Sequence, residues 1–471
     1  MKNIKYIIVF GIITVFFSSC MMGPDFQKPD IVVEDSFLGE HIAADSINLR
    51  WWELFGDEVL DTLVTHALEY NRDILMAAKR IEQARAYHGM TKADLWPSIS
   101  VQAGAASGNY IGGGAKFKNS SNSFYVTPAL SWELDFWGKY RSLSAAALSE
   151  MVASEFGMRS MQISLISEIS ATYFELLDYQ NRLEISRKTV EARLKSLKII
   201  QLRFDNGIIP EIDVNQAEAQ WAIAQAAVPA YERSVAQTSY VLSILIGENP
   251  RYFDFITNNK PIQNPEIPAG IPSKLIERRP DVSQAEMLLR AQNSQIGAAI
   301  AARFPSISLT GLAGVASPEF STLLDGGLAW SAGASLLGPI FEFGKNKRRV
   351  EVERKKAEEL VYNYENTILN AFKDVEDALI NVKTLKEELA ARKIYFDVLN
   401  NAATLSASRY DKGVSSYLEV LETERSAFEA ELKLSQVEQK LLNSYVGLYK
   451  ALGGGWLSAE EEQNAKDEQA K

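Results

Sequence analysis

The 471-residue chain has one cysteine and three histidines, which is little material for a disulfide framework or a metal centre. A lone thiol cannot form an internal disulfide, so none is expected to stabilise the fold. His41, His66 and His88 lack metal-ligand spacing, and neither a phosphate-binding GxxxxGK[ST] nor a nucleophile-elbow GxSxG motif occurs. The sequence therefore predicts no catalysis, no metal site and no cofactor.

Excess positive charge is also missing. The formal net charge is −11, which argues against nucleic acid as a partner. The 46% hydrophobic and 23% charged content is ordinary for a folded protein and excludes wholesale disorder. Acidic residues are spread along the chain except in SAEEEQNAKDEQAK, so residues 456–471 are expected to form a disordered, solvated tail.

The N-terminus has the pattern of a secretory signal peptide, predicted over residues 1–19. Lys2 and Lys5 precede an apolar run over residues 6–17, which is shorter than the roughly 20 residues that a membrane-spanning helix needs. The stretch ends FSSC, which resembles a bacterial lipobox with Phe17 in place of the commoner Leu. This resemblance implies cleavage before Cys20 and its acylation; a cysteine at this place by chance is the alternative. Residues 20–56 then form an acylated N-terminal segment.

The chain carries an internal repeat. Shifting the sequence by 206 residues pairs the same residue types over more than a hundred positions. The pairs include Gly138-Lys139 with Gly344-Lys345, Arg203 with Arg409, Gly207 with Gly413, Glu218 with Glu424, and Gly247 with Gly453. Amphipathic helices resemble one another, but helical periodicity does not explain Gly and Lys at a fixed register. We interpret 57–250 and 276–455 as a tandem duplication joined by a linker over 251–275.

Each repeat contains a long helical pattern. No proline interrupts 345–411, and apolar residues there alternate steps of three and four, which is typical of a coiled-coil seam. The seam residues are Val361, Tyr364, Ile368, Ala371, Val375, Ala378, Val382, Leu385 and Leu389, matched in 139–205 by Leu165, Ile169, Thr172, Leu176, Tyr179 and Leu183. Each range predicts a helix of about 100 Å. Gly207 and Gly413 are expected to end these helices, and return helices are predicted at 211–247 and 417–452.

Segments of period two lie between the helices, and they predict strands at about 97–107, 123–137, 305–316 and 327–343. In FYVTPALSWELDFWG one face is apolar (Phe124, Val126, Leu130, Trp132, Leu134, Phe136) and the other is polar. Such strands are typical of outer membrane β-barrels; a soluble hairpin with one buried face is the alternative. Four strands cannot close a barrel, but three copies supply twelve. The expected fold class is therefore an α+β membrane protein with four antiparallel strands and long coiled-coil helices per chain.

Several motifs together resemble a TolC-like outer membrane factor, and more narrowly the lipoprotein (OprM/NodT-like) branch of the outer membrane efflux protein family. They are FSSC followed by GPDFQKPD, then WWELFGDEVLDTLVTHALEYNRDI, LWPSIS, WELDFWGK, IFEFGKNKRR, RYDKGVSSYLEVLETER and YKALGGGW. The resemblance covers nearly the whole chain. It implies a homotrimer with a 12-stranded transmembrane barrel, a periplasmic α-helical barrel, a membrane-fusion adaptor and an inner-membrane pump of the RND type as partners.

The resemblance also implies a periplasmic gate at the helix tips. Tyr410 and Asp213 match a linked pair, and Glu419 and Glu422 match acids that ring the constriction. In a trimer these acids would form six carboxylates, which favour cations and raise some pKa values. A second family link is absent, because Ser415 and Ile212 stand at its positions. The turns Gly207, Ile208 and Ile209 and Gly413, Val414 and Ser415 match those that contact the adaptor.

The basic run KNKRR at 345–349 begins a predicted helix, where cations oppose the helix dipole. It suits a place near lipid headgroups or acidic neighbours, and a merely solubilising surface is the alternative. Lys139 and Arg141 hold the corresponding place in the first repeat.

The predicted function is an outer membrane channel that exports drugs or other small molecules, anchored to the outer membrane by Cys20 and extending into the periplasm. The same fold can serve type I protein secretion or metal-ion efflux, which is one alternative. The other alternative is a structural surface lipoprotein that binds without conducting.

Overall fold

The computed structural model describes residues 21–29, 50–111, 115–255, 262, 265, 278–325 and 328–454. The predicted signal peptide, Cys20, most of the predicted linker and the acidic tail therefore lie outside the described residues. The chain divides into two compact units. Unit 1 takes its residues from Met1–Ile31, Lys79–Glu155 and Gln284–Asn366, and unit 2 from Val32–Ala78, Phe156–Ser283 and Thr367–Lys471.

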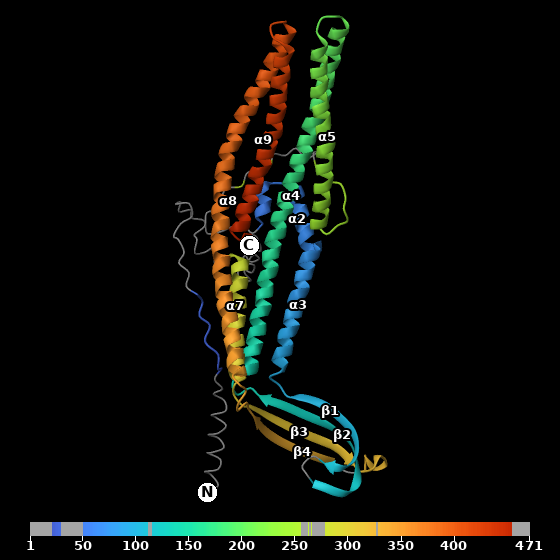
Figure 1. Ribbon diagram of the computed structural model, residues 1–471, viewed down its shortest axis with the longest axis vertical. Coiled ribbons are helices and arrows are strands. Elements are labelled where there is room, and N and C mark those ends of the chain that lie inside the picture. The colour runs from blue at the N-terminus through green and yellow to red at the C-terminus, as the bar shows by residue number, and fades with distance from the viewer. Residues whose placement is uncertain are drawn as a thin grey trace, which may run out of the picture. The chain divides into compact units, whose positions relative to one another are not determined.

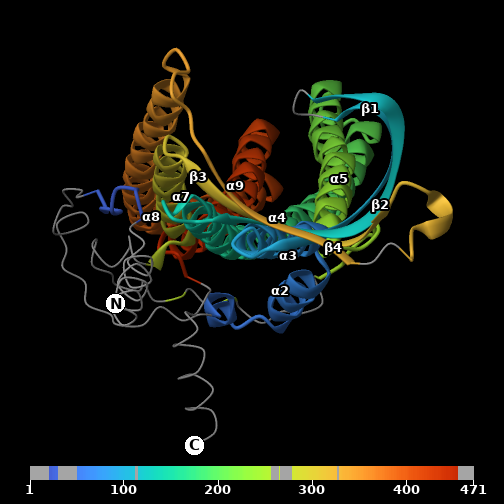
Figure 2. The same cartoon turned by 90° about the horizontal axis from the view of Figure 1, so that it is seen from below.

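Unit 1 contains a four-stranded antiparallel sheet in the order β1-β2-β3-β4. The strands are β1 (Ser98–Ile111), β2 (Ala115–Leu134), β3 (Ser306–Ser317) and β4 (Leu328–Leu337). The register pairs Ser98 with Ser131, Leu130 with Gly311 and Ser306 with Leu337. Figure 2 shows the hairpin of β1 and β2 as strongly curved. Among the described residues β1 and β4 pair on one side only, so the sheet has two open edges. The prediction of four antiparallel strands together with long helices is confirmed.

Two strands end earlier than predicted. The sequence predicted a strand to residue 137, but β2 ends at Leu134 because the Asp135 carboxylate accepts hydrogen bonds from the Tyr140 and Arg141 amides, each at 2.9 Å. These bonds turn the chain into the next helix, so Phe136 is not part of the predicted apolar strand face. The last strand was predicted to 343, but β4 ends at Leu337. Pro339 follows closely and has no N–H to extend a ladder.

The first hairpin is longer than predicted. Residues 109–121 have the composition of a surface loop, yet β1 runs to Ile111 and β2 begins at Ala115, with a register shift between Gly108 and Tyr110. Ladder pairing here overrides the weak strand propensity of Ser, Asn and Lys. The second loop carries a short 3-10 helix, η2 (Phe320–Thr322), in its described part.

The long helices have the bounds that the repeat suggested. They are α4 (Lys139–Asp205) and α8 (Lys345–Asp411), each of 67 residues, and each contributes residues to both units. The predicted seam residues from Tyr364 to Val382 are buried, as are Leu165, Ile169, Thr172, Leu176 and Leu183. Among the described residues, no helix is both long enough and apolar enough to cross a membrane.

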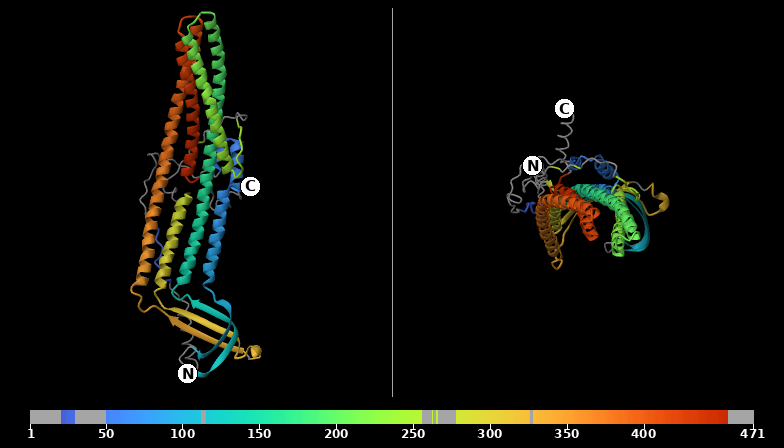
Figure 3. Two further views of the ribbon diagram at one scale, coloured as in Figure 1. Left: turned by 45° about the vertical axis from the view of Figure 1, so that its right-hand side comes forward. Right: turned by 90° about the horizontal axis from the view of Figure 1, so that it is seen from above.

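In unit 2 each long helix is followed by a shorter helix that returns beside it (Figure 1 and Figure 3). The return helices are α5 (Glu211–Leu245) and α9 (Tyr417–Ala451), each of 35 residues. Arg187 on α4 pairs with Glu232 on α5 at 2.8 Å, and the Lys386 ammonium on α8 lies 5.5 Å from the Tyr445 ring centroid on α9. We call α4 with α5 hairpin 1 and α8 with α9 hairpin 2.

The core of unit 2 is built around η1 (Trp51–Phe55), a 3-10 helix with the sequence WWELF, and α2 (Glu58–Tyr70). The indole of Trp51 is fully buried and stacks on Tyr449 of α9, with ring centroids 5.2 Å apart and planes 4° from parallel. Phe55 contacts Phe174 of α4 with ring centroids 4.9 Å apart. These aromatic contacts attach the segment before α2 to both hairpins.

In unit 1 the segment over residues 21–29 packs along α7 (Pro280–Ala301). Lys28 pairs with Glu286 at 2.8 Å, and the Asn293 side-chain amide donates to the Pro24 carbonyl at 2.8 Å. Gly23 lies so close to Gly297 that a Cβ on Gly23 would come within 2.9 Å of the Gly297 Cα. Met21 lies beside Gly138, at the start of α4. Met21, the first described residue, is therefore held between the end of the sheet and the start of the helices in unit 1.

Candidate functional site

The repeated motif RFDNG and RYDKG forms the turn at the tip of each hairpin. Gly207 and Gly413 have φ of +71° and +73°, in the left-handed region that glycine adopts without strain. The Ile208 amide donates to the Arg203 carbonyl at 2.9 Å, and the Val414 amide donates to the Arg409 carbonyl at 3.0 Å. This is the Schellman arrangement, which ends a helix by satisfying its last carbonyls. The repeat therefore preserves a helix stop.

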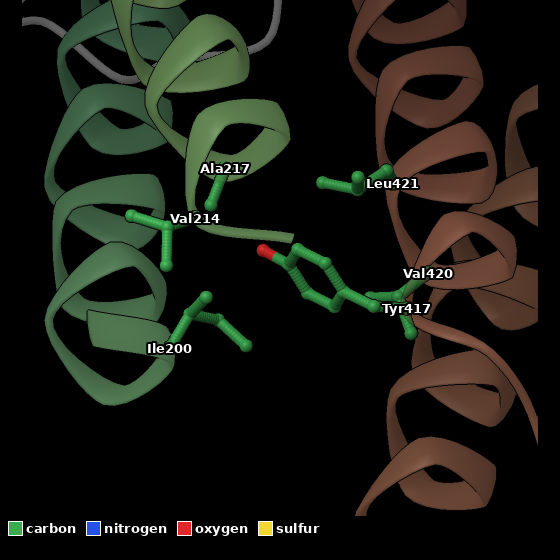
Figure 4. Packing of buried hydrophobic residues seen from close by; sticks show 6 residues of the cluster. All are labelled: Ile200, Val214, Ala217, Tyr417, Val420 and Leu421. Atoms are coloured by element: carbon green, nitrogen blue, oxygen red, sulfur yellow. The ribbon is translucent and has the colours of Figure 1, made fainter. Parts of the chain in front are cut away.

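An apolar contact joins the two hairpins near these tips. Its members are Ile200, Val214, Ala217, Tyr417, Val420 and Leu421, which we call the tip cluster. The first three lie on hairpin 1 and the last three on hairpin 2, and α5 and α9 approach closely here. Figure 4 shows the Tyr417 ring reaching across the gap, with its hydroxyl directed toward Val214 and Ala217. Burial raises the pKa of Tyr417, which keeps its hydroxyl neutral.

Polar contacts at the tips also cross between the hairpins. Arg203 on α4 pairs with Asp411 on α8 at 3.2 Å, and its guanidinium lies 5.1 Å from the Tyr410 ring centroid. The Tyr410 hydroxyl is buried and has no hydrogen-bond partner within the part of the chain that the structure describes. The link of Tyr410 with Asp213 stays a prediction. In the described residues the Arg203 guanidinium lies against the Tyr410 ring.

The two predicted ring acids each have an arginine partner within the chain. Glu419 pairs with Arg409 at 3.2 Å, and Glu422 binds Arg425 with contacts of 2.6 and 3.2 Å. The bond with Arg425 holds the pKa of Glu422 below its ordinary value. The predicted rise of some pKa values concerns a ring of six carboxylates in a trimer and stays a prediction. Both acids lie one turn apart on the first part of α9, as expected.

The remaining predicted tip residues differ in exposure. Ile208 and Val414 are exposed, whereas Ile209 packs against the tip cluster. The Ser415 hydroxyl is buried without a partner among the described residues, and Ile212 is exposed, so neither residue forms a link in this chain. Cys20, the predicted lipidation site, lies outside the described residues.

A buried arginine was not predicted from the sequence. Arg193 on α4 is 5% exposed, donates from Nη1 to the Gln220 carbonyl at 2.6 Å and lies 5.1 Å from the Phe428 ring centroid. Desolvation lowers the pKa of Arg193 and raises the pKa of the nearby Glu424 carboxyl. Glu424 pairs with Glu218 at the 206-residue shift, but nothing in the sequence around it indicated that its carboxyl would be shielded from water. Tyr417, Arg193 and Arg203 therefore make contacts between the two hairpins that the sequence did not predict.

Comparison with known proteins decides what this arrangement belongs to. A sequence model of the family described as "Outer membrane efflux protein" matches residues 63–248 and 271–454. The chain belongs to the outer membrane efflux protein family. Relatives include the solvent efflux pump outer membrane protein SrpC of Pseudomonas putida, 34% identical over 93% of this chain and 96% of the relative. The cation efflux system protein CusC of Escherichia coli is 32% identical over 93% of this chain and 96% of CusC.

Solved structures agree with the family. The CmeC outer membrane channel of Campylobacter jejuni has a TM-score of 0.87 and 26% identity, covering 96% of this chain and 98% of CmeC. The chain is thus the outer membrane channel component of an efflux system. Family members are efflux channels rather than enzymes.

Proposed function

We propose that three copies of this outer membrane efflux protein assemble into one conduit. The observation that supports this most directly is the four-stranded sheet with open edges at β1 and β4. Unpaired backbone amides in lipid cost several kcal/mol each, so an open edge must be paired. Three sheets paired edge to edge form a barrel of twelve strands, wide enough to leave a lumen.

The helices of the three copies would form the second tube of the conduit in the periplasm. The proposed tandem duplication fits this arrangement, because two similar hairpins per chain give six nearly equivalent ones per trimer. Helices α4 and α8 are of equal length, α5 and α9 are of equal length, and the family matches the chain in two segments. In this proposal the exposed Ile208 and Val414 at the tips contact the adaptor, and the pump is of the RND type.

Cys20 is proposed to carry a lipid that anchors the protein. The packing of residues 21–29 supports this, because Met21 is held beside Gly138, immediately after the sheet. A proposed barrel would end at that level, so the acyl chains attached to the preceding residue would have only a short distance to reach the membrane.

The cargo is proposed to be organic small molecules, including drugs and solvents. SrpC belongs by name to a solvent efflux pump, which supports this choice, while CusC is named for cation efflux and supports metal ions as the second candidate. Deleting the gene and measuring susceptibility to solvents, drugs and metal salts separates the two, since each cargo predicts a different sensitised class.

Conductance in planar bilayers tests the conduit. The purified full-length protein is expected to insert as a trimer, by mass, and to give discrete channel events. A structural rod that binds without conducting gives none. Stable monomers in detergent, or trimers that leave the bilayer silent, would overturn the proposal.

The acids of the proposed gate give a prediction on ion selectivity. Glu422→Gln removes a carboxylate from each copy near the tips and is expected to reduce the cation-to-anion permeability ratio by roughly twofold to fivefold, since one charge at close range in water is worth about 1 kcal/mol. Arg425→Gln is the matched opposite, because it frees Glu422 and Glu429 from their partner and should raise the ratio. Reversal potentials in a salt gradient measure both. Identical potentials in both variants and in the unmodified channel would argue against a carboxylate ring.

A further inference from the structure

The two connections from the sheet to a long helix differ in charge, although they occupy equivalent places in the two halves of unit 1. In the first connection, WELDFWGKYR, Lys139 pairs with Glu133 at 3.0 Å and Arg141 pairs with Asp135 at 3.1 Å. Burial by itself would lower the pKa of Lys139, but the bonds with Glu133 and Tyr140 outweigh it, so the pKa is raised. Each cation of the first connection is therefore neutralised by an acid six residues before it.

The second connection, GPIFEFGKNK, has no acid at these two places, although it carries Glu342. At the 206-residue shift, Pro339 takes the place of Glu133, and Phe341 takes the place of Asp135. Lys345 and Lys347 keep the positive charge of Lys139 and Arg141.

Within the part of the chain that the structure describes, three cations at the start of α8 consequently have no ion pair. Arg348 pairs with Glu351 at 2.7 Å, but Lys345, Lys347 and Arg349 have no ion pair within the described residues. A run of unpaired cations attracts an anion from outside the chain by simple charge complementarity. We call residues 345–349 the basic segment.

The basic segment borders a cavity of about 510 Å³ within unit 1. Lys345, Asn346 and Arg349 line one part of it, and Trp137 and Phe304, which stack with ring centroids 4.6 Å apart, line another. Glu133 and Lys139 also lie at its wall, but they already pair with each other. Asp135, which pairs with Arg141, and Glu342 line it as well. With the two ion pairs set aside, Lys345 and Arg349 stand against Glu342, so the cavity combines a net charge of about +1 with an aromatic wall.

Exposed apolar side chains lie directly before the basic segment. Ile340 is fully exposed, Phe341 is 73% exposed and Phe343 is 90% exposed, and the two phenyl rings contact each other at 4.6 Å between centroids. Phe343 has a φ of +49°, a left-handed conformation that is unfavourable for a bulky residue. Aromatic side chains next to clustered Lys and Arg are typical of the boundary between a membrane's hydrocarbon and its headgroups.

We propose that Ile340–Arg349 and the adjoining cavity bind the headgroup of an anionic phospholipid, with the phosphate against Lys345, Lys347 and Arg349 and the acyl chains along Ile340, Phe341 and Phe343. The proposal rests on the proposed barrel, which places the end of β4 at the periplasmic face of the membrane. Such a bound lipid would cover apolar surface that the first connection does not expose. Added salt would weaken the binding of this lipid, because exposed charges are screened.

Native mass spectrometry of the detergent-solubilised full-length protein tests this site. The probes are phosphatidylglycerol and, as the zwitterionic reference, phosphatidylethanolamine. The variant combines Lys345→Gln, Lys347→Gln and Arg349→Gln. Each cation near an anionic lipid is worth about 1 kcal/mol, or about fivefold, so the preference for phosphatidylglycerol is expected to fall by up to roughly 100-fold.

The control combines Lys355→Gln, Lys356→Gln and Lys373→Gln. It removes the same charge from α8 at lysines that already pair with Glu358, Glu353 and Asp377. This control should keep the preference. A second variant, Pro339→Glu with Phe341→Asp, restores the acids of the first connection without removing a cation, and it should lose the preference as the triple variant does.

Three results would overturn the proposal. The first is equal retention of the two lipids by the unmodified protein, and the second is an equal loss in the control. The third is dissociation of the triple variant into single chains in lipid-free detergent. That result would mean that the cations of the basic segment pair with acidic side chains of a second copy and not with lipid. Trimer mass and bilayer conductance are measured in parallel, so a failure of the conduit itself is seen separately from a failure of the lipid site.

Discussion

Replacing Trp51 with alanine is expected to destabilise the protein by about 4 kcal/mol, within the range for deleting a fully buried aromatic side chain. The indole has no exposed surface, stacks on Tyr449 and meets Trp52 and Phe55 edge to face, so its removal leaves a cavity between η1 and α9. For a chain of this size the apparent Tm should fall by roughly 5 °C. Intrinsic fluorescence of the purified protein during heating measures the change.

Trp51→Phe is the matched control. The Trp51 Nε1 has no hydrogen-bond partner among the described residues, so phenylalanine forfeits no bond and keeps most of the stack on Tyr449. Its Tm should lie much closer to that of the unmodified protein than to that of Trp51→Ala. Equal losses in the two variants would mean that the aromatic stack is not what holds η1.

The second large effect is expected at the tip cluster. Tyr417→Ala removes the only aromatic member of the cluster, which reaches across from hairpin 2 to Val214 and Ala217. If the closed state of the channel depends on this contact, the loss of about 3 kcal/mol shifts the closed-to-open ratio by roughly 100-fold. Open probability in planar bilayers should therefore rise by about tenfold or more. Sensitivity of cells to large antibiotics entering from outside provides a second measurement.

Tyr417→Phe separates packing from hydrogen bonding, because it keeps the ring and removes only the hydroxyl. It should gate like the unmodified channel. Arg203→Gln tests the polar contact beside the cluster; the pair with Asp411 is largely exposed, so its effect should be small beside that of Tyr417→Ala. A silent Tyr417→Ala channel with an unchanged trimer mass would remove the tip cluster from the gate.

The long helices could be located from the sequence because their stop signals act locally. Gly207 and Gly413 each follow an unbroken helical pattern and supply the left-handed residue that the turn requires, so the ends of α4 and α8 need no information from distant residues. The seam residues were equally predictable from the sequence, since a buried helical face repeats every three to four residues.

The strand ends were harder to predict from the sequence because they depend on specific contacts. Strand β2 ends where the Asp135 carboxylate binds two amides that come later in the chain. Alternation alone continued to Phe136, because Asp and Phe also alternate there. The first hairpin extends through polar residues whose pairing depends on the neighbouring strand rather than on their own propensity.

The contacts at the tips depended on the packing of distant segments. Arg203 and Asp411 are 208 positions apart, and no periodicity within either helix shows that they meet. A family resemblance suggested Tyr410 with Asp213, and the contact of Tyr410 with Arg203 was not predicted. Charge and spacing can name candidates at a helix tip, but the partner of each one is decided by how two hairpins pack.

The open edges of β1 and β4 have a consequence for biogenesis. Every newly exported chain carries two rows of unpaired amides that any other strand can occupy. A pair of chains that has joined one edge of each still presents two edges, so the intermediate is as prone to aggregation as the single chain. In the proposed trimer only arrival of the third copy ends this exposure, and slow delivery therefore leaves such intermediates exposed for longer unless a chaperone covers their open edges.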